Sequence, residues 1–184
     1  MNILIVSIDH RVQLIKSEYA KPALNERRDR LENLLQKKVA ERDVQFIGEE
    51  SLPQTPTIAQ RLARTHNPQI PWVNIDMTDE ERKLAGIHDA LHNRPAHTEK
   101  RGEDTVLIEH RIPDDNVRED FMVSRAIQNA RNSESILILC GDMYVHALKQ
   151  KFEERGHSVD IDESLITEKN WADASSPRNA TATL

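Results

Sequence analysis

The stretch ILILCGD, Ile136–Asp142, joins five consecutive apolar residues to a glycine and an acid. Short apolar runs that end in turn residues are typical of buried parallel strands. Two other runs share this pattern: Ile3–Ser7 leads into Ile-Asp-His, and Val44–Ile47 leads into Gly-Glu-Glu. Because ligands bind beyond the carboxyl ends of the strands in open α/β sheets, these polar ends predict a site at one edge of one sheet.

The rest of the chain alternates further short strands with amphipathic helices. Thr78 followed by Glu81 predicts a capping box at the start of one helix, because each side chain satisfies a backbone N–H. The alternation predicts a single α/β domain with a mostly parallel central sheet and helices on both faces. Further strands are expected at Trp72–Ile75 and Val159–Ile161, and helices at Lys21–Glu41, Thr57–Thr65, Thr78–Leu91, Asp114–Asn132 and Tyr144–Arg155.

Two parts of the chain lack a periodic pattern. Asn93–Asp104 is polar, contains Pro and Gly, and is predicted to form a loop. Thr105–Glu109 is either a short edge strand or a continuation of that loop. Large apolar residues become sparse near the end, so we assign residues 1–166 to the α/β domain and residues 167–184 to a polar, frayed tail.

Composition narrows the possible function classes. The 184 residues carry a net charge of −6 and no block of Lys and Arg, which argues against a nucleic-acid partner, since phosphate binding needs a concentrated basic surface. No apolar stretch reaches the roughly 18 residues typical of a membrane span. The single cysteine, Cys140, cannot form an internal disulfide and is expected to be a small core residue. We therefore expect a cytoplasmic protein without a membrane partner.

Imidazole and carboxylate side chains gather at the predicted strand ends. Such groups bind a divalent metal or act as general bases near neutral pH. The sequence lacks the HExxH, GxSxG, Walker A and GxGxxG motifs, so none of the sites that those motifs form is expected. The strand-end residues are His10, Glu49, Glu50, Asp142 and His146.

Each candidate also has a structural interpretation. His10 opens a loop, where histidines are often solvated, and Asp142 is placed to cap the helix that follows it. Glu49 and Glu50 would repel each other in a shared crevice, so one of them is expected on the surface. Arg118 lies near a helix N-terminus, which disfavours a cation, so it has either an anionic partner nearby or a surface salt bridge.

Four stretches carry a pattern in chain order: Ser7–His10, Ile47–Glu50, Val117–Met122 and Leu139–His146. Together they resemble a superfamily of hydrolase-like proteins, the TraB/PrgY, Tiki, ChaN-like and erythromycin-esterase-like group. Its members share a histidine after the first strand, an acid after the second, an arginine in a late helix, and a Gly-x-x-His turn after a late strand. Here four residues separate Gly141 from His146. The resemblance implies an α/β fold, a pocket over the strand ends and, in some relatives, metal-dependent peptidase or metal-independent esterase chemistry.

The leading hypothesis is a small hydrolase acting on a small-molecule or peptide substrate, with one divalent ion of unassigned identity as an optional cofactor. Glu49 or Glu50 would act with the histidines to hold the metal or activate water, since a bound metal lowers the pKa of its water toward neutrality. Arg118 would stabilise an anionic intermediate or a substrate carboxylate. The candidate catalytic residues are His10, Glu49, Glu50, Arg118 and His146, and the candidate metal ligands are His10, Glu50, Asp142 and His146.

Two other classes of function would use the same features. A non-catalytic module would bind or sense a small molecule or a metal in the same crevice. A subunit that binds a protein partner would use side chains such as Trp72 and Trp171 as anchors. Turnover of a panel of esters, peptides and phosphoesters separates the hydrolase from the binding module, and a metal titration separates it from the partner-binding subunit.

Overall fold

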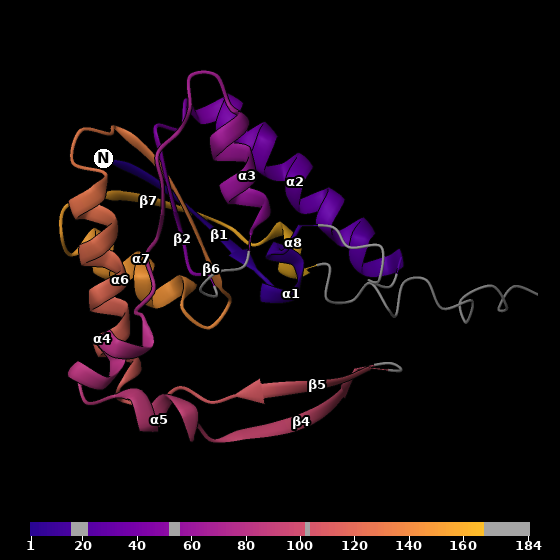
Figure 1. Cartoon of the computed structure of the whole chain (residues 1–184), viewed down its shortest axis with the longest axis vertical. Helices are drawn as coiled ribbons and strands as arrows, with labels where there is room; N and C mark the ends of the chain where they lie inside the picture. Colours follow the sequence, from indigo (N-terminus) through magenta and orange to yellow (C-terminus); the bar gives the residue numbers. More distant parts are fainter. Residues whose placement is uncertain (16–21, 52–55, 102–103, 168–184) are drawn as a thin grey trace, which may run out of the picture.

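The computed structural model describes residues 1–15, 22–51, 56–101 and 104–167. Figure 1 shows a central sheet with helices on both faces and a separate two-stranded hairpin. The chain is a single α/β domain, as predicted, and the strands of its central sheet are all parallel. Their spatial order is β3 (Trp72–Asn74), β2 (Phe46–Glu49), β6 (Ser135–Gly141), β1 (Asn2–Ile8) and β7 (Ser158–Asp162).

The register of the sheet brings the carboxyl ends of three neighbouring strands to one edge. Ile8, the last residue of β1, lies opposite Gly141, the last residue of β6. Glu49, the last residue of β2, lies opposite Leu139 of β6. The residues that directly follow these strands therefore meet at this edge, as the three apolar runs predict.

Helices cover both faces of the sheet, which explains why its strands are apolar on both sides. In β6, Ile138 packs with the helices of one face and the next residue, Leu139, with those of the other. The helices are α6 (Asp115–Asn129) and α7 (Val145–Glu153) on the first face, and α2 (Pro22–Arg42) and α3 (Ile58–Thr65) on the second (Figure 1).

The connections after β1 and β6 diverge to opposite faces of the sheet. β1 leads through the short helix α1 (His10–Gln13) to α2, whereas β6 leads to α7 on the other face. Because β1 and β6 are neighbours, the chain reverses its winding between them. Such topological switch points are where open α/β sheets bind ligands. In this sheet the switch point lies between β1 and β6, with His10 after β1 and the turn that follows Gly141 after β6.

The predicted helix Thr78–Leu91 is interrupted. Its capping box is confirmed: the Thr78 hydroxyl accepts from the Glu81 N–H at 3.2 Å, and the Glu81 carboxylate accepts from the Thr78 N–H at 2.8 Å. The chain then leaves the helix at Gly86, whose φ of +72° lies in the left-handed region that glycine adopts readily. The segment therefore forms two short helices, α4 (Asp79–Leu84) and α5 (His88–His92).

A β-hairpin lies where a polar loop was predicted. β4 (Ala96–Arg101) and β5 (Asp104–Glu109) pair antiparallel and form a sheet of their own. In Figure 1 this hairpin extends beyond the carboxyl ends of the central strands. The loop prediction was wrong for β4 because a strand that does not join the central sheet needs no apolar alternation. For Thr105–Glu109 the strand alternative is confirmed, although this strand lies in the hairpin and not at an edge of the central sheet.

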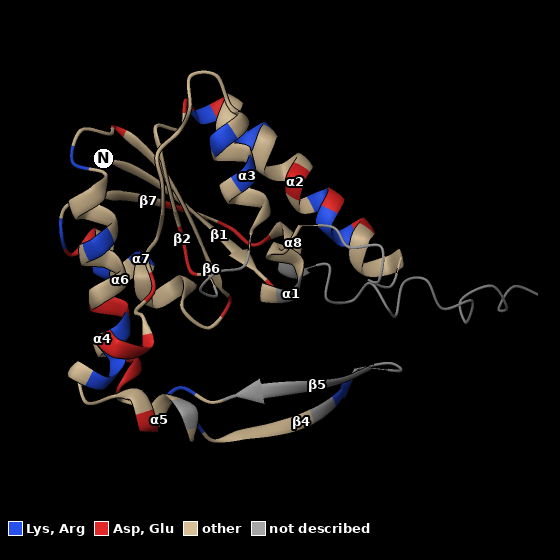
Figure 2. Cartoon of the chain, in the orientation of Figure 1, with Lys and Arg blue, Asp and Glu red and all other residues tan. Residues whose placement is uncertain are grey.

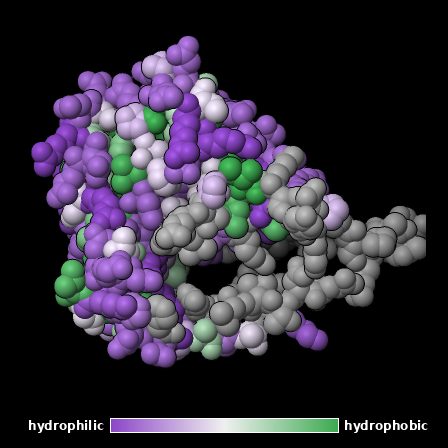
Figure 3. Space-filling model, in the orientation of Figure 1, coloured by the Kyte–Doolittle hydropathy of each residue, from purple (hydrophilic) through white to green (hydrophobic). Residues whose placement is uncertain are grey.

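Charged residues of both signs are mixed along the helices (Figure 2). Figure 2 shows Lys and Arg interspersed with Asp and Glu along α2 and α6, and Figure 3 shows a mainly hydrophilic face. Within the described ranges, no helix combines the length and the apolar character needed to cross a membrane. Trp171 and the predicted tail lie outside the described residues, apart from Thr167 at the end of α8 (Ser164–Thr167).

Replacing Gly48 with Ala is expected to lower the free energy of unfolding by about 1–3 kcal/mol, the range typical of an overpacked core. A Cβ at this position of β2 would lie 2.8 Å from Ile138 Cδ1 and 2.9 Å from Ile75 Cγ2, both of which are fully buried. Urea denaturation measures the change. An unchanged midpoint would mean that the core around β2 has room for a methyl group.

Candidate functional site

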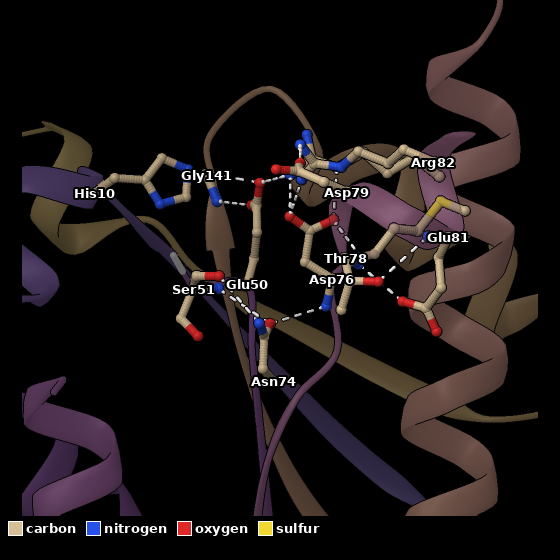
Figure 4. A network of polar contacts seen from close by, with 12 residues as sticks. His10, Glu50, Ser51, Asn74, Asp76, Thr78, Asp79, Glu81, Arg82 and Gly141 are labelled. Carbon is tan, nitrogen blue, oxygen red and sulfur yellow. Dashed lines mark hydrogen bonds and ion pairs between the residues drawn. The ribbon is translucent and has the colours of Figure 1, made fainter. Parts of the chain in front are cut away.

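Glu50 lies at the centre of a polar network at the carboxyl edge of the sheet (Figure 4). It follows β2 directly, and its side chain is only 4% exposed. One carboxylate oxygen accepts from the Gly141 N–H at 2.8 Å, and the other accepts from Arg118 Nη2 at 2.6 Å. The network therefore holds a buried carboxylate in a fixed position between two neighbouring strand ends.

His10 approaches the same carboxylate from the end of β1. Its Nε2 lies 3.6 Å from Glu50 Oε1, and its side chain is 43% exposed. Its other ring nitrogen, Nδ1, lies 2.8 Å from Gln13 Oε1, one turn further along α1. The structure thus brings together the imidazole and one of the two glutamates that the sequence singled out, with the imidazole open to solvent.

Gly141 permits this approach because it has no side chain. A Cβ at this position would lie 2.9 Å from His10 Nε2 and 3.5 Å from Glu50 Oε2. Its backbone N–H also donates to Glu50. The glycine at the end of β6 therefore contributes both a hydrogen bond and the space that His10 occupies.

Arg118 of α6 binds Glu50 together with a second buried carboxylate, Asp76. Its Nε donates to Asp76 Oδ1 at 2.7 Å and its Nη2 to Asp76 Oδ2 at 2.6 Å, and Arg82 Nη2 also donates to Oδ2 at 2.7 Å. The anionic partner expected for Arg118 is confirmed. Its partners are internal, however, so the guanidinium holds Glu50 and Asp76 in place.

The charges in this cluster stabilise one another. Burial disfavours the charged form of Arg118, but its hydrogen bonds to Asp76 and the charges of Glu50 and Asp76 outweigh burial and raise its pKa. Burial alone would raise the pKa of Asp76, yet the hydrogen bond and charge of Arg118 hold that pKa below its ordinary value. Both groups are therefore charged at neutral pH.

Tyr144 joins this network to the base of the hairpin. Its hydroxyl accepts from Arg118, and Arg94 donates to it at 3.2 Å. Arg94, just before β4, also forms a two-point ion pair with Asp115 of α6, with Nη2 2.5 Å from Oδ1 and Nη1 3.2 Å from Oδ2. Burial raises the pKa of Tyr144, so its hydroxyl keeps its proton and donates it toward Asp115.

Glu49 occupies a separate buried position. Its carboxylate accepts from Thr57 at 2.6 Å, from Trp72 Nε1 at 2.7 Å and from Gln13 Nε2 at 3.0 Å. Burial raises the pKa of Glu49 despite these three donors. One of the two adjacent glutamates was expected on the surface, and this expectation was wrong: Glu49 is 0% exposed and Glu50 3%. Both carboxylates can be buried because each accepts hydrogen bonds from its own set of donors.

His146 points elsewhere. It lies on α7 with its side chain 78% exposed, and its Nε2 is 3.4 Å from Glu163 Oε1. Tyr144, two residues earlier, is the residue that contacts Arg118. Two residues correspond to about 200° around a helix, so His146 faces away from the position that Tyr144 fills. Tyr144 is three residues after Gly141, so it takes the position that the histidine holds in a Gly-x-x-His turn.

The predicted set of metal ligands is not assembled. Among the described residues, no group of three or more His, Cys, Asp or Glu side chains is arranged to hold a metal ion. His10 and Glu50 lie together, but His146 pairs with Glu163 and Asp142 is exposed in the turn before α7. Asp142 is not the helix cap either, because Tyr144 takes that position.

Sequence reasoning missed Asp76, Tyr144 and Gln13. Asp76 follows the end of the third predicted strand, so the rule that found Glu50 would also have found Asp76. Tyr144 lies within Leu139–His146, where the resemblance points to the histidine. No sequence pattern pointed to Gln13. A glutamine in a four-residue helix does not indicate hydrogen bonds to Glu49, at the end of β2, and to Glu50, which follows it.

Comparison of the chain with protein-family models, with curated proteins and with solved structures gave no match. The superfamily resemblance of the four strand-end stretches therefore stays a prediction.

Replacing Gly141 with Ala is expected to displace His10 while leaving the fold intact. The added methyl group would meet the far end of a half-exposed ring, which can rotate away. The change in unfolding free energy should stay within about 1 kcal/mol, since the loss of glycine entropy in the unfolded chain offsets the crowding. NMR of the His10 ring, which should shift, and urea denaturation check the two parts. An unmoved ring would mean that this glycine does not set the approach of His10.

Proposed function

We propose that the chain is a small hydrolase in which His10 is the general base. The observation that carries this proposal is the pairing of a solvent-accessible imidazole with a buried, fixed carboxylate at the topological switch point of the sheet. His10 Nε2 and Glu50 Oε1 are 3.6 Å apart, which is longer than a hydrogen bond. The two atoms are therefore not bonded to each other, and a water molecule or a substrate hydroxyl beside them could bridge both, with Oε1 also held by Arg118.

Glu50 would orient the nucleophilic water in this proposal. Its carboxylate is anchored by Arg118 and by the Gly141 N–H, so it keeps its position when His10 takes up a proton. The carboxylate also stabilises the imidazolium that forms, because an opposite charge a few ångströms away favours the charged ring. His10 takes a proton from the water as the water oxygen attacks an ester or amide carbonyl. The ring then returns this proton to the leaving alcohol or amine as the C–O or C–N bond breaks.

Arg118 takes a different role from the one suggested by the sequence. Its donors are directed at Asp76, Glu50 and Tyr144, which supports a positioning role toward Glu50 rather than direct contact with a substrate. A divalent ion remains an optional part of the proposal, with His10 and Glu50 as the protein groups that would reach it. Any further ligands would be water or substrate.

The test is turnover of a panel of esters, peptides and phosphoesters by the purified protein. The panel is run untreated, after treatment with a chelator, and after addition of Mg²⁺, Mn²⁺ or Zn²⁺. Turnover of one substrate class supports the proposal, and the chelator result decides whether a metal takes part. No turnover under any condition, together with saturable binding of a small molecule, would replace the hydrolase by the binding-module alternative.

Replacing His146 with Gln is expected to leave turnover essentially unchanged. The side chain is exposed and contacts Glu163, not Glu50 or Arg118. The measurement is kcat/KM on the substrate that the panel identifies, with thermal melting to confirm the fold. Loss of activity in a folded variant would return His146 to the catalytic role suggested by the sequence.

A further inference from the structure

The side-chain amide of Gln13 connects all three strand-end groups on one side of the site. The amide oxygen of Gln13 lies 2.8 Å from His10 Nδ1. The amide nitrogen lies 3.0 Å from Glu49 Oε1 and 2.6 Å from the main-chain oxygen of Glu50. Gln13 is itself only 2% exposed. Every hydrogen-bonding atom of this amide that faces the site therefore has a named partner.

The partners determine which way round the amide lies. A main-chain carbonyl oxygen only accepts hydrogen bonds, so the Gln13 atom 2.6 Å from the Glu50 carbonyl must be the NH₂ group. Its second N–H is directed at the carboxylate of Glu49. The remaining atom, Oε1, is an acceptor and faces His10 Nδ1.

An acceptor at this position selects one form of the neutral imidazole. Because Gln13 Oε1 can only accept, His10 Nδ1 must carry the proton in their hydrogen bond. A neutral ring protonated on Nδ1 has its lone pair on Nε2, the nitrogen that faces Glu50. The free pair is thus on the side where the proposed nucleophile would lie.

We infer that Gln13, held by Glu49, is a positioning residue that keeps His10 in the Nδ1–H form and so leaves Nε2 free to act as the base. The inference rests on the proposed function of His10. Glu49 is well placed to hold the amide, because Thr57 and Trp72 fix its other oxygen at 2.6 and 2.7 Å. A water molecule would donate one O–H to Nε2 and the other to Glu50, which leaves its oxygen free to attack.

The test reads the proton directly by two-bond ¹H–¹⁵N NMR of the uniformly ¹⁵N-labelled chain at about pH 9, where imidazoles are neutral. The His10 signal is assigned by its disappearance in His10→Gln. The wild-type ring should carry its proton on Nδ1. In Gln13→Met, which keeps the length of the side chain but cannot accept at that point, the population should shift toward Nε2–H, the form that free imidazole side chains favour. Gln150→Met is the matched control. Gln150 is an exposed residue of α7, so its replacement should leave the His10 spectrum unchanged.

Activity gives the second readout. If the panel identifies a substrate, Gln13→Met should lower kcat/KM by a factor on the order of 10², the lower range for loss of a competent acid–base group. A wild-type His10 protonated on Nε2 would overturn the inference even if the protein hydrolyses a substrate. Conversely, Nδ1–H in a protein without turnover would uphold the hold of Gln13 on the His10 ring but overturn the hydrolase proposal, and with it the role of Nε2 as a base. The wild-type spectrum decides the matter should Gln13→Met fail to fold.

Discussion

Replacing Arg118 with Met is expected to lower the free energy of unfolding by about 3–5 kcal/mol, the range typical of removing one partner from a buried ion pair. Arg118 is 11% exposed and binds two carboxylates that are themselves 4% and 6% exposed, those of Glu50 and Asp76. Met retains much of the apolar volume but leaves both acids without their main cation. Equilibrium urea denaturation at neutral pH measures the effect.

Arg155→Met is the matched control. Arg155 is 35% exposed and pairs with Asp120, which is 52% exposed, so its loss should change stability by about 1 kcal/mol or less. Similar losses for the two variants would mean that the cluster around Arg118 is no more important than a surface ion pair.

The loss caused by Arg118→Met should also shrink as the pH falls. In the wild type, the pKa of Asp76 is lowered, so its contribution to stability is present above the unfolded Asp pKa of about 4 and is lost as the pH falls through the lower folded value. Without Arg118, burial would raise the pKa of this carboxyl, and protonation below that value would relieve the variant. A loss that stays constant from neutral pH to about pH 4 would contradict this account of the cluster.

Replacing His10 with Gln is expected to reduce kcat/KM by a factor on the order of 10² to 10⁴, the range for removing a general acid–base group. Gln retains hydrogen-bonding atoms but cannot take up a proton near neutral pH. Stability should change by about 1 kcal/mol or less, because the ring is 43% exposed and few core contacts depend on it. Kinetics on the best panel substrate and urea denaturation check the two parts.

His66→Gln provides the control for this variant. His66 follows the last residue of α3, and its ring contacts a main-chain oxygen of Pro68 rather than any group of the site. Activity should be retained. If His10→Gln unfolds the protein, His10 is structural; if it folds and keeps full activity, His10 is not the base.

The central sheet could be predicted because its signal is local. Apolar runs such as Ile136–Cys140 must be buried on both faces, and a run of that length is too short for a helix of typical size. The hairpin could not be predicted in the same way. Its strands pair with each other, so the sequence of β4 does not need the apolar alternation that marks a strand against a core.

The candidate site was predictable as far as the strand ends determine it. His10 follows β1 and Glu50 follows β2, the two strands that flank β6, so the parallel strand ends bring both residues to one edge of the sheet. Arg118 was marked by its position near a helix N-terminus. The role of Arg118 was not predictable. Its partner Asp76 follows β3, and the sequence does not show that β3 lies beside β2. The helix prediction placed the start of α7 correctly, at its N-cap Tyr144, but the sequence pattern favoured His146 because imidazole is a metal ligand and a general base.

The identity of the base is tested most directly by kcat/KM of the wild type, His10→Gln and His146→Gln on one substrate under the same conditions. The proposed function predicts a loss on the order of 10² or more for His10→Gln and no appreciable loss for His146→Gln. Full activity of a folded His10→Gln, with loss of activity in His146→Gln, would contradict the assignment of the site to His10 and Glu50.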